Sequence, residues 1–267
     1  MDEIKRINGE IARKGFAFAS SMLTDQERFY DSRAGGYDRQ MERCERVQRR
    51  KKIFALYHSI LRKRMRGKEI SYLDFGCGTG KATLEFIDGL EKYCKIKEGR
   101  AIDISSEMVK LAKRNLKNFK VKQGTVAGIG CKAKYDLITS FFHVLCHLDD
   151  KGVEEFFKNS GKSLKKGGFI CFDVMKNFKV GEHGYSKTDW KERRNYAAYH
   201  SLDKNGNAIT DKKGGPLIGT DRLFTRDEIV KNAKHAGLKV VKIAELRIKN
   251  PDPKIGHINE FVAILSK

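Results

Sequence analysis

The stretch Ser71–Thr83, S-Y-L-D-F-G-C-G-T-G-K-A-T, decides the fold. The apolar run from Ile70 to Phe75 predicts a buried strand, and the residues after Thr83 have the apolar spacing of a helix. Three glycines at alternate positions, Gly76, Gly78 and Gly80, lie between the two. Glycine permits a tight turn and lets a ligand approach the backbone, and a helix that starts there offers free N–H groups. The stretch therefore predicts a strand, a glycine turn and a helix that form a ligand site.

Two nucleotide-binding patterns do not fit this turn. A phosphate-binding P-loop requires glycine where the chain has Phe75, and serine or threonine where it has Ala82. A dinucleotide site requires G-x-G-x-x-G, and here the third glycine comes one residue early. The pattern D-x-G-x-G-x-G instead resembles motif I of the class I S-adenosylmethionine (SAM)-dependent methyltransferases. In that family the turn contacts the amino-acid part of SAM. The resemblance thus implies that SAM is the cofactor and that it contacts Asp74, Gly76, Cys77, Gly78 and Gly80.

A second acid, Asp103, stands at the end of the next predicted strand. A carboxylate in this place can accept hydrogen bonds from both ribose hydroxyls of a nucleoside, and the family has an acid there. Where many relatives have Gly-Asp near the adenine, this chain has Gly-Thr. The resemblance also places five further residues in the cofactor site: Ile104, Met108, Thr125, Val126 and Phe141.

The segment F-Y-D-S-R-A-G-G-Y-D-R, residues 29–39, resembles the Y-D-x-x-A-x-x-Y-D segment of many small-molecule methyltransferases. In those enzymes it forms part of a lid over SAM. The resemblance implies that Tyr30 contacts the cofactor and that Tyr37 lines the methyl-transfer pocket as a candidate catalytic residue. Two tyrosines that pack a helix pair are the alternative, since tyrosine combines an apolar ring with a polar tip.

A strand predicted over residues 135–142 leads into F-F-H-V-L-C-H-L. This segment is similar to that of enzymes acting on small molecules and of some tRNA wobble-uridine methyltransferases. It lacks the Asn/Asp-Pro-Pro-Tyr/Phe motif of enzymes that methylate exocyclic amino groups of bases. His143 is the candidate general base, with a pocket wall as the alternative, and His147 is interpreted as a packed histidine. The two are spaced as metal ligands can be, but no third ligand is evident, so no metal is expected.

The 267 residues carry a formal net charge of +21, which favours an anionic partner such as RNA or simply a solvated basic surface. Gly35-Gly36 is expected to break the N-terminal helical pattern. A long basic helix then follows from about 38 to 66, and its arginines are expected on a solvated or phosphate-contacting face. No stretch has the length of a membrane span and no signal peptide is evident, so a cytoplasmic location and no membrane partner are expected.

With the alternation of predicted strands and helices, the resemblance implies an α/β, Rossmann-like fold: a seven-stranded, mostly parallel sheet with helices on both faces. Residues 1–67 are expected to form a helical lid, 68–267 the SAM-binding core, and 176–222 an insertion that covers the substrate. The predicted activity is transfer of a methyl group from SAM to an oxygen, nitrogen or carbon of a small-molecule acceptor. Methylation of RNA, including tRNA, through the basic surface is the first alternative. A protein that binds SAM and RNA without catalysis is the second.

Overall fold

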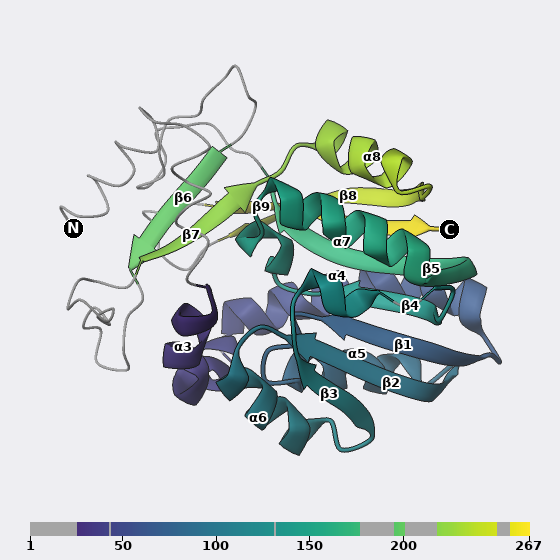
Figure 1. The fold of residues 1–267 in the computed structure, drawn as a ribbon, viewed down its shortest axis with the longest axis horizontal. Coiled ribbons are helices and arrows are strands. Elements are labelled where there is room, and N and C mark those ends of the chain that lie inside the picture. The colour runs from purple at the N-terminus through teal and green to yellow at the C-terminus, as the bar shows by residue number, and fades with distance from the viewer. Residues whose placement is uncertain (1–25, 43, 131, 177–194, 201–217, 250–256) are drawn as a thin grey trace.

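The computed structural model describes residues 26–42, 44–130, 132–176, 195–200, 218–249 and 257–267 (Figure 1). Its helices are α3 (Gln26–Met41), α4 (Cys44–Met65), α5 (Lys81–Leu90), α6 (Ser106–Asn115), α7 (Asp150–Ser163) and α8 (Arg226–His235), with the short 3₁₀ helices η2 (Val126–Ile129) and η3 (Val144–His147). Its strands are β1 (Glu69–Phe75), β2 (Lys95–Asp103), β3 (Phe119–Gln123), β4 (Tyr135–Ser140), β5 (Leu164–Met175), β6 (Asn195–His200), β7 (Ile218–Leu223), β8 (Lys239–Lys249) and β9 (His257–Ser266). The first 25 residues of the predicted lid and most of the predicted insertion lie outside the described residues.

Seven strands form one sheet in the order β3-β2-β1-β4-β5-β9-β8. Strands β1 to β5 pair in parallel, and β9 runs antiparallel to both of its neighbours. The chain builds outward from β1 through β2 to β3 and then returns to place β4 on the other side of β1. Ligands of such sheets bind at this reversal, beyond the carboxyl ends of the strands. The predicted fold class is confirmed.

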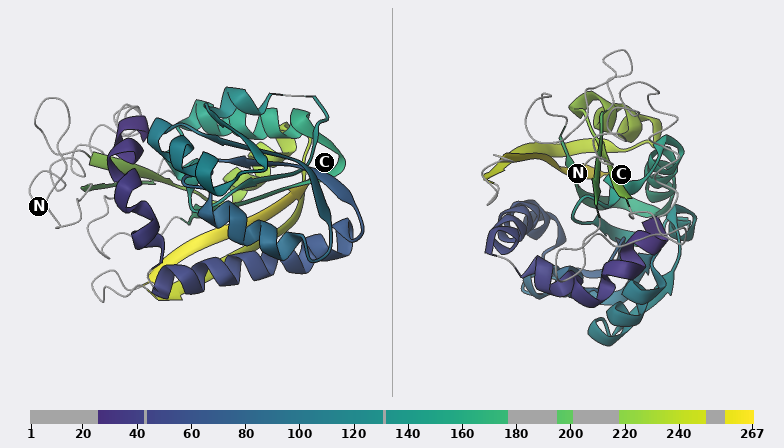
Figure 2. Two further views of the ribbon diagram at one scale, coloured as in Figure 1. Left: turned by 90° about the horizontal axis from the view of Figure 1, so that it is seen from below. Right: turned by 90° about the vertical axis from the view of Figure 1, so that its left-hand side faces the viewer.

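Helices cover both faces of the sheet (Figures 1 and 2). On one face, Phe54 and Tyr57 of α4 and Phe86 of α5 are buried in one apolar cluster with Tyr72 of β1. On the other face, α7 and α8 pack in a second cluster around Phe172 of β5. Helix α6 covers the outer strands in a third, smaller cluster. The predicted lid boundary at residue 67 stays a prediction, but α4 shares its hydrophobic core with the sheet.

The expected helix break at Gly35-Gly36 is wrong. Helix α3 continues through both glycines and ends at Met41, with a turn at residue 42. A glycine pair lowers helix propensity by about 2 kcal/mol, which tertiary contacts of α3 can offset. The expected single helix from about 38 to 66 is therefore two helices, α3 and α4.

Helix α3 lies across the end of the sheet, beyond the carboxyl ends of the parallel strands (Figure 2, left). On the same side, β6 and β7 form a separate antiparallel pair. This arrangement places the glycine turn, helix α3 and the β6–β7 pair around one region of the molecule. Among the described helices, none has the length and apolar character needed to cross a membrane.

Candidate functional site

A cavity of about 450 Å³ lies between α3 and the carboxyl ends of the central strands. Every residue that the sequence placed in the site lines it except Gly80 and His143. The predicted residues that it contains are Tyr30, Tyr37, Asp74, Gly76, Cys77, Gly78, Asp103, Ile104, Met108, Thr125, Val126 and Phe141. Its size is that of a small-molecule or cofactor site.

The glycine turn has the backbone geometry for which glycine is required. Gly76, Gly78 and Gly80 have φ values of 73°, 54° and 80°. This left-handed region costs other residues roughly 1–2 kcal/mol. A Cβ on Gly76 would also lie 2.4 Å from a methyl of Val144, and one on Gly80 would lie 2.8 Å from Leu116. Gly80 therefore supports the turn from behind, as the residue that begins α5, while Gly76 and Gly78 face the cavity.

Asp103 ends β2 and fixes the same turn. Its Oδ2 accepts a hydrogen bond from the Gly78 N–H at 2.7 Å, and its Oδ1 accepts one from the Ser105 N–H at 2.9 Å. Burial raises the pKa of Asp103, while these two N–H donors act in the opposite direction. A carboxylate has about four acceptor positions. Two are taken here, so Asp103 can still accept from a ligand's hydroxyls.

Asp74 lies below the turn in a buried network of hydroxyls. Thr83 donates to its Oδ2, and Thr139 donates to its Oδ1 at 2.7 Å. Tyr72 in turn lies 2.6 Å from the Thr139 hydroxyl. Burial raises the pKa of Asp74 to about 7, despite the hydrogen bonds from Thr83 and Thr139, which lower it. The carboxyl group is thus easier to protonate in the folded chain than in the unfolded one.

We expect Asp74 to make the protein less stable as the pH rises from about 4 to about 7. Its pKa is near 3.8 when unfolded and about 7 when folded, so in this window the folded state binds the extra proton. The loss can reach a few kcal/mol, at 1.36 kcal/mol per pKa unit. Urea unfolding of the wild type and of Asp74→Asn at pH 4.5 and pH 7.5 measures it. The variant should lose less stability between the two values, and an equal loss in both would contradict the assignment.

Two aspartates of α3 accept hydrogen bonds that hold this helix over the cavity. Asp31 Oδ1 accepts from the Ser105 hydroxyl at 2.5 Å and from the Glu107 N–H at 3.1 Å, at the start of α6. Asp38 accepts from the Thr79 hydroxyl at 2.6 Å, next to the glycine turn. A carboxylate at a helix N-terminus is stabilised by the free N–H groups and the helix dipole. Helix α3 therefore contacts the two segments that surround the predicted cofactor site.

Tyr30 and Tyr37 reach from α3 into the cavity, with ring centroids 6.4 Å apart. Burial raises the pKa of both phenols. For Tyr30 the neighbouring Tyr37 and Asp221 raise it further. Both phenols therefore remain protonated at neutral pH and can donate a hydrogen bond.

A chain of polar groups crosses the cavity wall from Tyr30. Its hydroxyl lies 2.5 Å from Nε2 of His147 in η3, and Nδ1 of His147 lies 3.0 Å from Oδ1 of Asp221 in β7. The second pair is within ion-pair distance but not aligned as a hydrogen bond. The side chains of His147 and Asp221 are only 11% and 14% exposed. His147, interpreted from the sequence as a packed histidine, thus lines the cavity between two polar partners.

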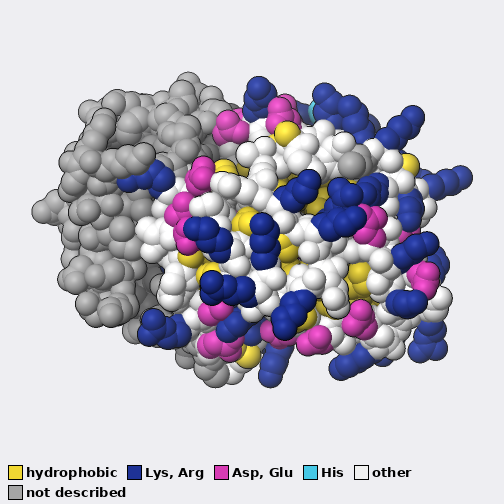
Figure 3. Space-filling model, turned by 60° about the horizontal axis from the view of Figure 1, so that its bottom comes forward, with side chains coloured by type: hydrophobic (Ala, Val, Ile, Leu, Met, Phe, Trp, Pro, Cys, Tyr) yellow, Lys and Arg dark blue, Asp and Glu magenta, His cyan; other side chains and the backbone are white. Residues whose placement is uncertain are grey.

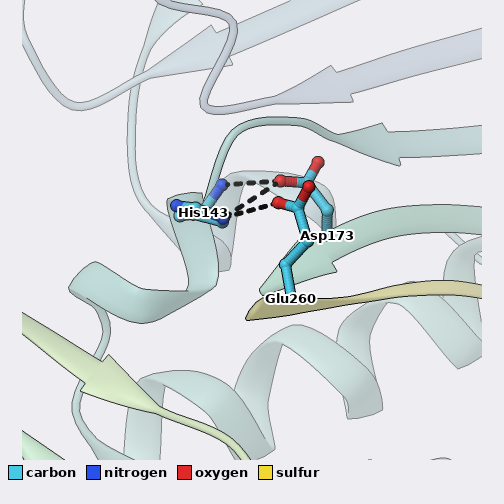
Figure 4. Close-up of side chains that lie close together, drawn as sticks. All are labelled: His143, Asp173 and Glu260. Atoms are coloured by element: carbon cyan, nitrogen blue, oxygen red, sulfur yellow. Dashed lines mark hydrogen bonds and ion pairs between the residues drawn. The ribbon is translucent and has the colours of Figure 1, made fainter. Parts of the chain in front are cut away.

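His143 occupies a different environment (Figure 4). It does not line the cavity, and its Nε2 lies 2.9 Å from Oε2 of Glu260 and 2.6 Å from Nη2 of Arg49. Arg49 also forms ion pairs with Glu260 and, at 2.9 Å, with Asp173. The expected solvated or phosphate-contacting position of this arginine is wrong, because its side chain is only 12% exposed. Arg50 is likewise buried, in an ion pair with Glu85. The catalytic role of His143 stays a prediction.

The ligand atoms of His143, Asp173 and Glu260 lie within 4.8 Å of one another, a spacing that a metal ion could use. The guanidinium of Arg49 already contacts all three side chains, so this group supplies the positive charge there. Burial raises the pKa of Glu260, but Arg49 and His143 outweigh it and hold that pKa at about 2. The cluster is accordingly an ion-pair network centred on Arg49.

The network holds a strained turn at the edge of the cavity. Phe142 and His143 have φ values of 61° and 67°, although neither is glycine. Asp173 accepts from the N–H groups of both residues, at 2.9 and 3.2 Å. Such conformations cost about 1–3 kcal/mol each and gather at functional sites. The turn directs Phe142 into the cavity and His143 into the network.

Sequence reasoning missed Asp221, Arg49 and Glu260. Asp221 and Glu260 lie far along the chain from the residues that they contact, and no local pattern marks either. Arg49 stands in a run of basic residues, and the sequence analysis expected all of them at the surface. Only the tertiary structure separates it from its neighbours.

The family model described as a methyltransferase domain matches residues 45–243, which is well over half of the chain. No curated protein matches the chain by sequence.

Several solved structures share the fold at low sequence identity. A SAM-dependent methyltransferase from Clostridium acetobutylicum ATCC 824 is 17% identical, with a TM-score of 0.59, covering 87% of this chain and 98% of its own. A SAM-dependent methyltransferase from Methanosarcina mazei is also 17% identical, with a TM-score of 0.57, covering 78% of this chain and 96% of its own. The Burkholderia thailandensis 1,6-didemethyltoxoflavin-N1-methyltransferase, solved with 1,6-didemethyltoxoflavin and S-adenosylhomocysteine, is 19% identical, with a TM-score of 0.55. It covers 90% of this chain and 85% of its own.

Proposed function

The chain belongs to the family of methyltransferase domains and is a SAM-dependent methyltransferase; on this premise we propose that its acceptor is a small molecule enclosed beneath α3. The observation that carries the proposal is the cavity itself. It is closed on one side by a helix that contacts the glycine turn and the start of α6. A flexible polymer would need an open groove, whereas an enclosed pocket suits a small acceptor.

The residues present fit SAM. Gly76 and Gly78 bring bare backbone to the cavity, and a Cβ on Gly78 would meet only Tyr37, at 3.8 Å. We propose that this turn holds the amino-acid part and that Asp103 accepts from the ribose hydroxyls. The adenine would then lie among Ile104, Met108, Thr125 and Val126. When bound, SAM supplies a methyl group on a sulfonium, which a well-aligned nucleophile displaces.

Replacing Asp103 by alanine should weaken SAM binding by about 1–3 kcal/mol, the usual cost of an unmet hydrogen-bonding group. The variant also releases the Gly78 N–H, so the turn loses one of its supports. Calorimetry with SAM on the wild type and on the variant measures the change. Asp136→Ala is the control, since that residue lies at the start of β4, away from the cavity. Unchanged affinity in a folded Asp103→Ala protein would remove Asp103 from the site.

The relative whose complex contains a small acceptor supports the same proposal. The Burkholderia enzyme holds 1,6-didemethyltoxoflavin together with S-adenosylhomocysteine. At 19% identity its likeness to this chain extends to the fold.

RNA is the second candidate, favoured by the net charge of +21. On the face shown in Figure 3, lysine and arginine side chains are spread widely and interspersed with acids. Two of the arginines in the expected basic face, Arg49 and Arg50, are buried in ion pairs. These features favour a generally basic surface over a dedicated groove for nucleic acid.

The predicted cytoplasmic location stays a prediction.

Incubation with labelled SAM and three acceptor pools in parallel tests the proposal: a small-molecule extract, total RNA and total protein. Label in the small-molecule pool alone is the expected result. Label in RNA, with binding that weakens by a log–log slope of about −0.7 per phosphate contact, would establish the second candidate instead. RNA binding without label would make the charge a non-specific surface property.

A further inference from the structure

We propose that His147 is the general base of this enzyme, that it takes the acceptor's proton through Tyr30, and that the acceptor is therefore an alcohol or a phenol. The inference rests on the proposed function, because it places a small acceptor with an O–H group beside Tyr30 in the cavity. Neither His147 nor Asp221 was among the residues that the sequence marked as catalytic.

The first step of the argument is location. The described part of the cavity wall contains one histidine, His147, while His143 lies outside it. Nε2 of His143 is engaged by Arg49 and Glu260. A general base must reach the proton that it removes, directly or through one intervening group. Of the two histidines in the F-H-V-L-C-H-L segment, only His147 meets this condition.

The second step is the direction of the hydrogen bond. The buried Tyr30 phenol stays protonated and lies 2.5 Å from Nε2 of His147, so it donates to that nitrogen. Nε2 is then the acceptor nitrogen, and the ring proton is on Nδ1, beside Asp221. A neutral imidazole in this tautomer is ready to accept a proton at Nε2. Asp221, whose Oδ1 lies 3.0 Å from Nδ1, then stabilises the positive charge that forms on the ring through its own negative charge.

The third step identifies the acceptor. With its own proton directed to His147, the Tyr30 oxygen keeps lone pairs free, and Tyr30 lines the cavity. These lone pairs can accept a hydrogen bond from a hydroxyl. An alcohol or phenol at this point must lose its proton to become a good nucleophile. An amine that binds in its neutral form already has a free electron pair and would have no need of these groups.

The step balances. The acceptor's O–H bond breaks, its proton passes to the Tyr30 oxygen, and the Tyr30 proton passes to Nε2 of His147. The new oxygen–carbon bond forms as the carbon–sulfur bond breaks, and the sulfur keeps that electron pair. The products are a methyl ether, a neutral thioether and an imidazolium beside Asp221. The positive charge that leaves the sulfur thus reappears on His147.

Nitrogen NMR of histidine side chains in the full chain, with S-adenosylhomocysteine bound, tests the relay without an acceptor. The His147 signal is identified by its loss in His147→Gln. We expect a protonated Nδ1, an unprotonated Nε2, and a shift of the Nε2 signal in Tyr30→Phe but not in Tyr37→Phe. A proton on Nε2 in the wild type would overturn the proposal, because that nitrogen could then accept nothing.

Turnover of the acceptor pool that takes up label gives the second readout. His147→Gln should lower kcat by at least 100-fold, within the usual contribution of a general base, while SAM affinity stays within threefold. Asp221→Asn should lower kcat by about 10-fold through the weakened base. His235→Gln, an exposed histidine on α8, is the control and should be unchanged. A His147→Gln enzyme within tenfold of the wild type would overturn the base while leaving the proposed function intact. Label in RNA or protein would overturn the function, and the NMR result would still decide the hydrogen-bond chain.

Discussion

Replacing Arg49 by methionine is expected to lower the free energy of unfolding by about 3–5 kcal/mol, the range for breaking a buried ion pair from one side. The substitution keeps an unbranched apolar side chain, so the loss of charge dominates the loss of volume. It leaves Glu260 and Asp173 fully buried without the cation that they share. Urea or guanidinium unfolding measures the change.

Two further variants make this result specific. Lys52→Met changes an exposed cation of the same helix and should cost less than about 0.5 kcal/mol. Arg49→Met combined with Glu260→Gln should recover part of the stability, because one stranded charge is removed. A loss below about 1 kcal/mol in Arg49→Met would show that the two carboxylates do not depend on Arg49.

Arg49→Met should also change the wall of the cavity. Asp173 holds the backbone of Phe142 and His143 in a conformation that costs energy, and Arg49 holds Asp173. A released turn would withdraw Phe142 from the cavity wall and shift Val144, which packs against Gly76. Buried ion pairs rarely add stability over an apolar core. We infer that this one serves to fix the turn between β4 and η3.

The sequence predicted the parts of this molecule that depend on local pattern. The turn between β1 and α5 needs glycine at positive φ, and the sequence has glycine at all three of these positions. Ser105 and Thr225 are of the residue types preferred at helix N-caps, and each accepts a backbone hydrogen bond from the first turn of its helix. The alternation of strands and helices, together with the family resemblance, predicted a mostly parallel sheet with helices on both faces, because few topologies connect such elements.

Long-range contacts were beyond the reach of pattern. Arg49 and Lys52 stand three residues apart on α4, yet one is buried among carboxylates and the other is exposed. The difference arises because Arg49 lies over the ends of β5 and β9, which come more than a hundred residues later. The sequence analysis interpreted His147 as a packed histidine for the same reason, because its partners Tyr30 and Asp221 come from α3 and β7. The helix break predicted at the glycine pair in α3 was wrong because the effect of helix propensity is weaker than the contacts that hold this helix.

Removing residues 1–41 should leave a folded core that binds S-adenosylhomocysteine about 100-fold more weakly. Helix α3 supplies Tyr30, Tyr37 and Met41 to the cavity wall, and Asp31 and Asp38 fasten it. Burial of one large side chain against a ligand contributes about 1.5–3 kcal/mol. The loss of the lid contacts should therefore cost about 3 kcal/mol, which corresponds to about two factors of ten in Kd.

The core should survive this truncation because its apolar clusters are built from α4 onward. Phe29 and Ala34 are buried residues of the lid, but neither belongs to the clusters on the two faces of the sheet. Circular dichroism and a cooperative thermal transition check the fold, and calorimetry with S-adenosylhomocysteine measures the affinity. Arg39→Ala in the full chain changes an exposed residue of α3 and should bind as the wild type does. If the folded truncated protein keeps wild-type affinity, then α3 is no lid over the cofactor, and if it also keeps wild-type turnover, then Tyr30 does not pass a proton from the acceptor to His147.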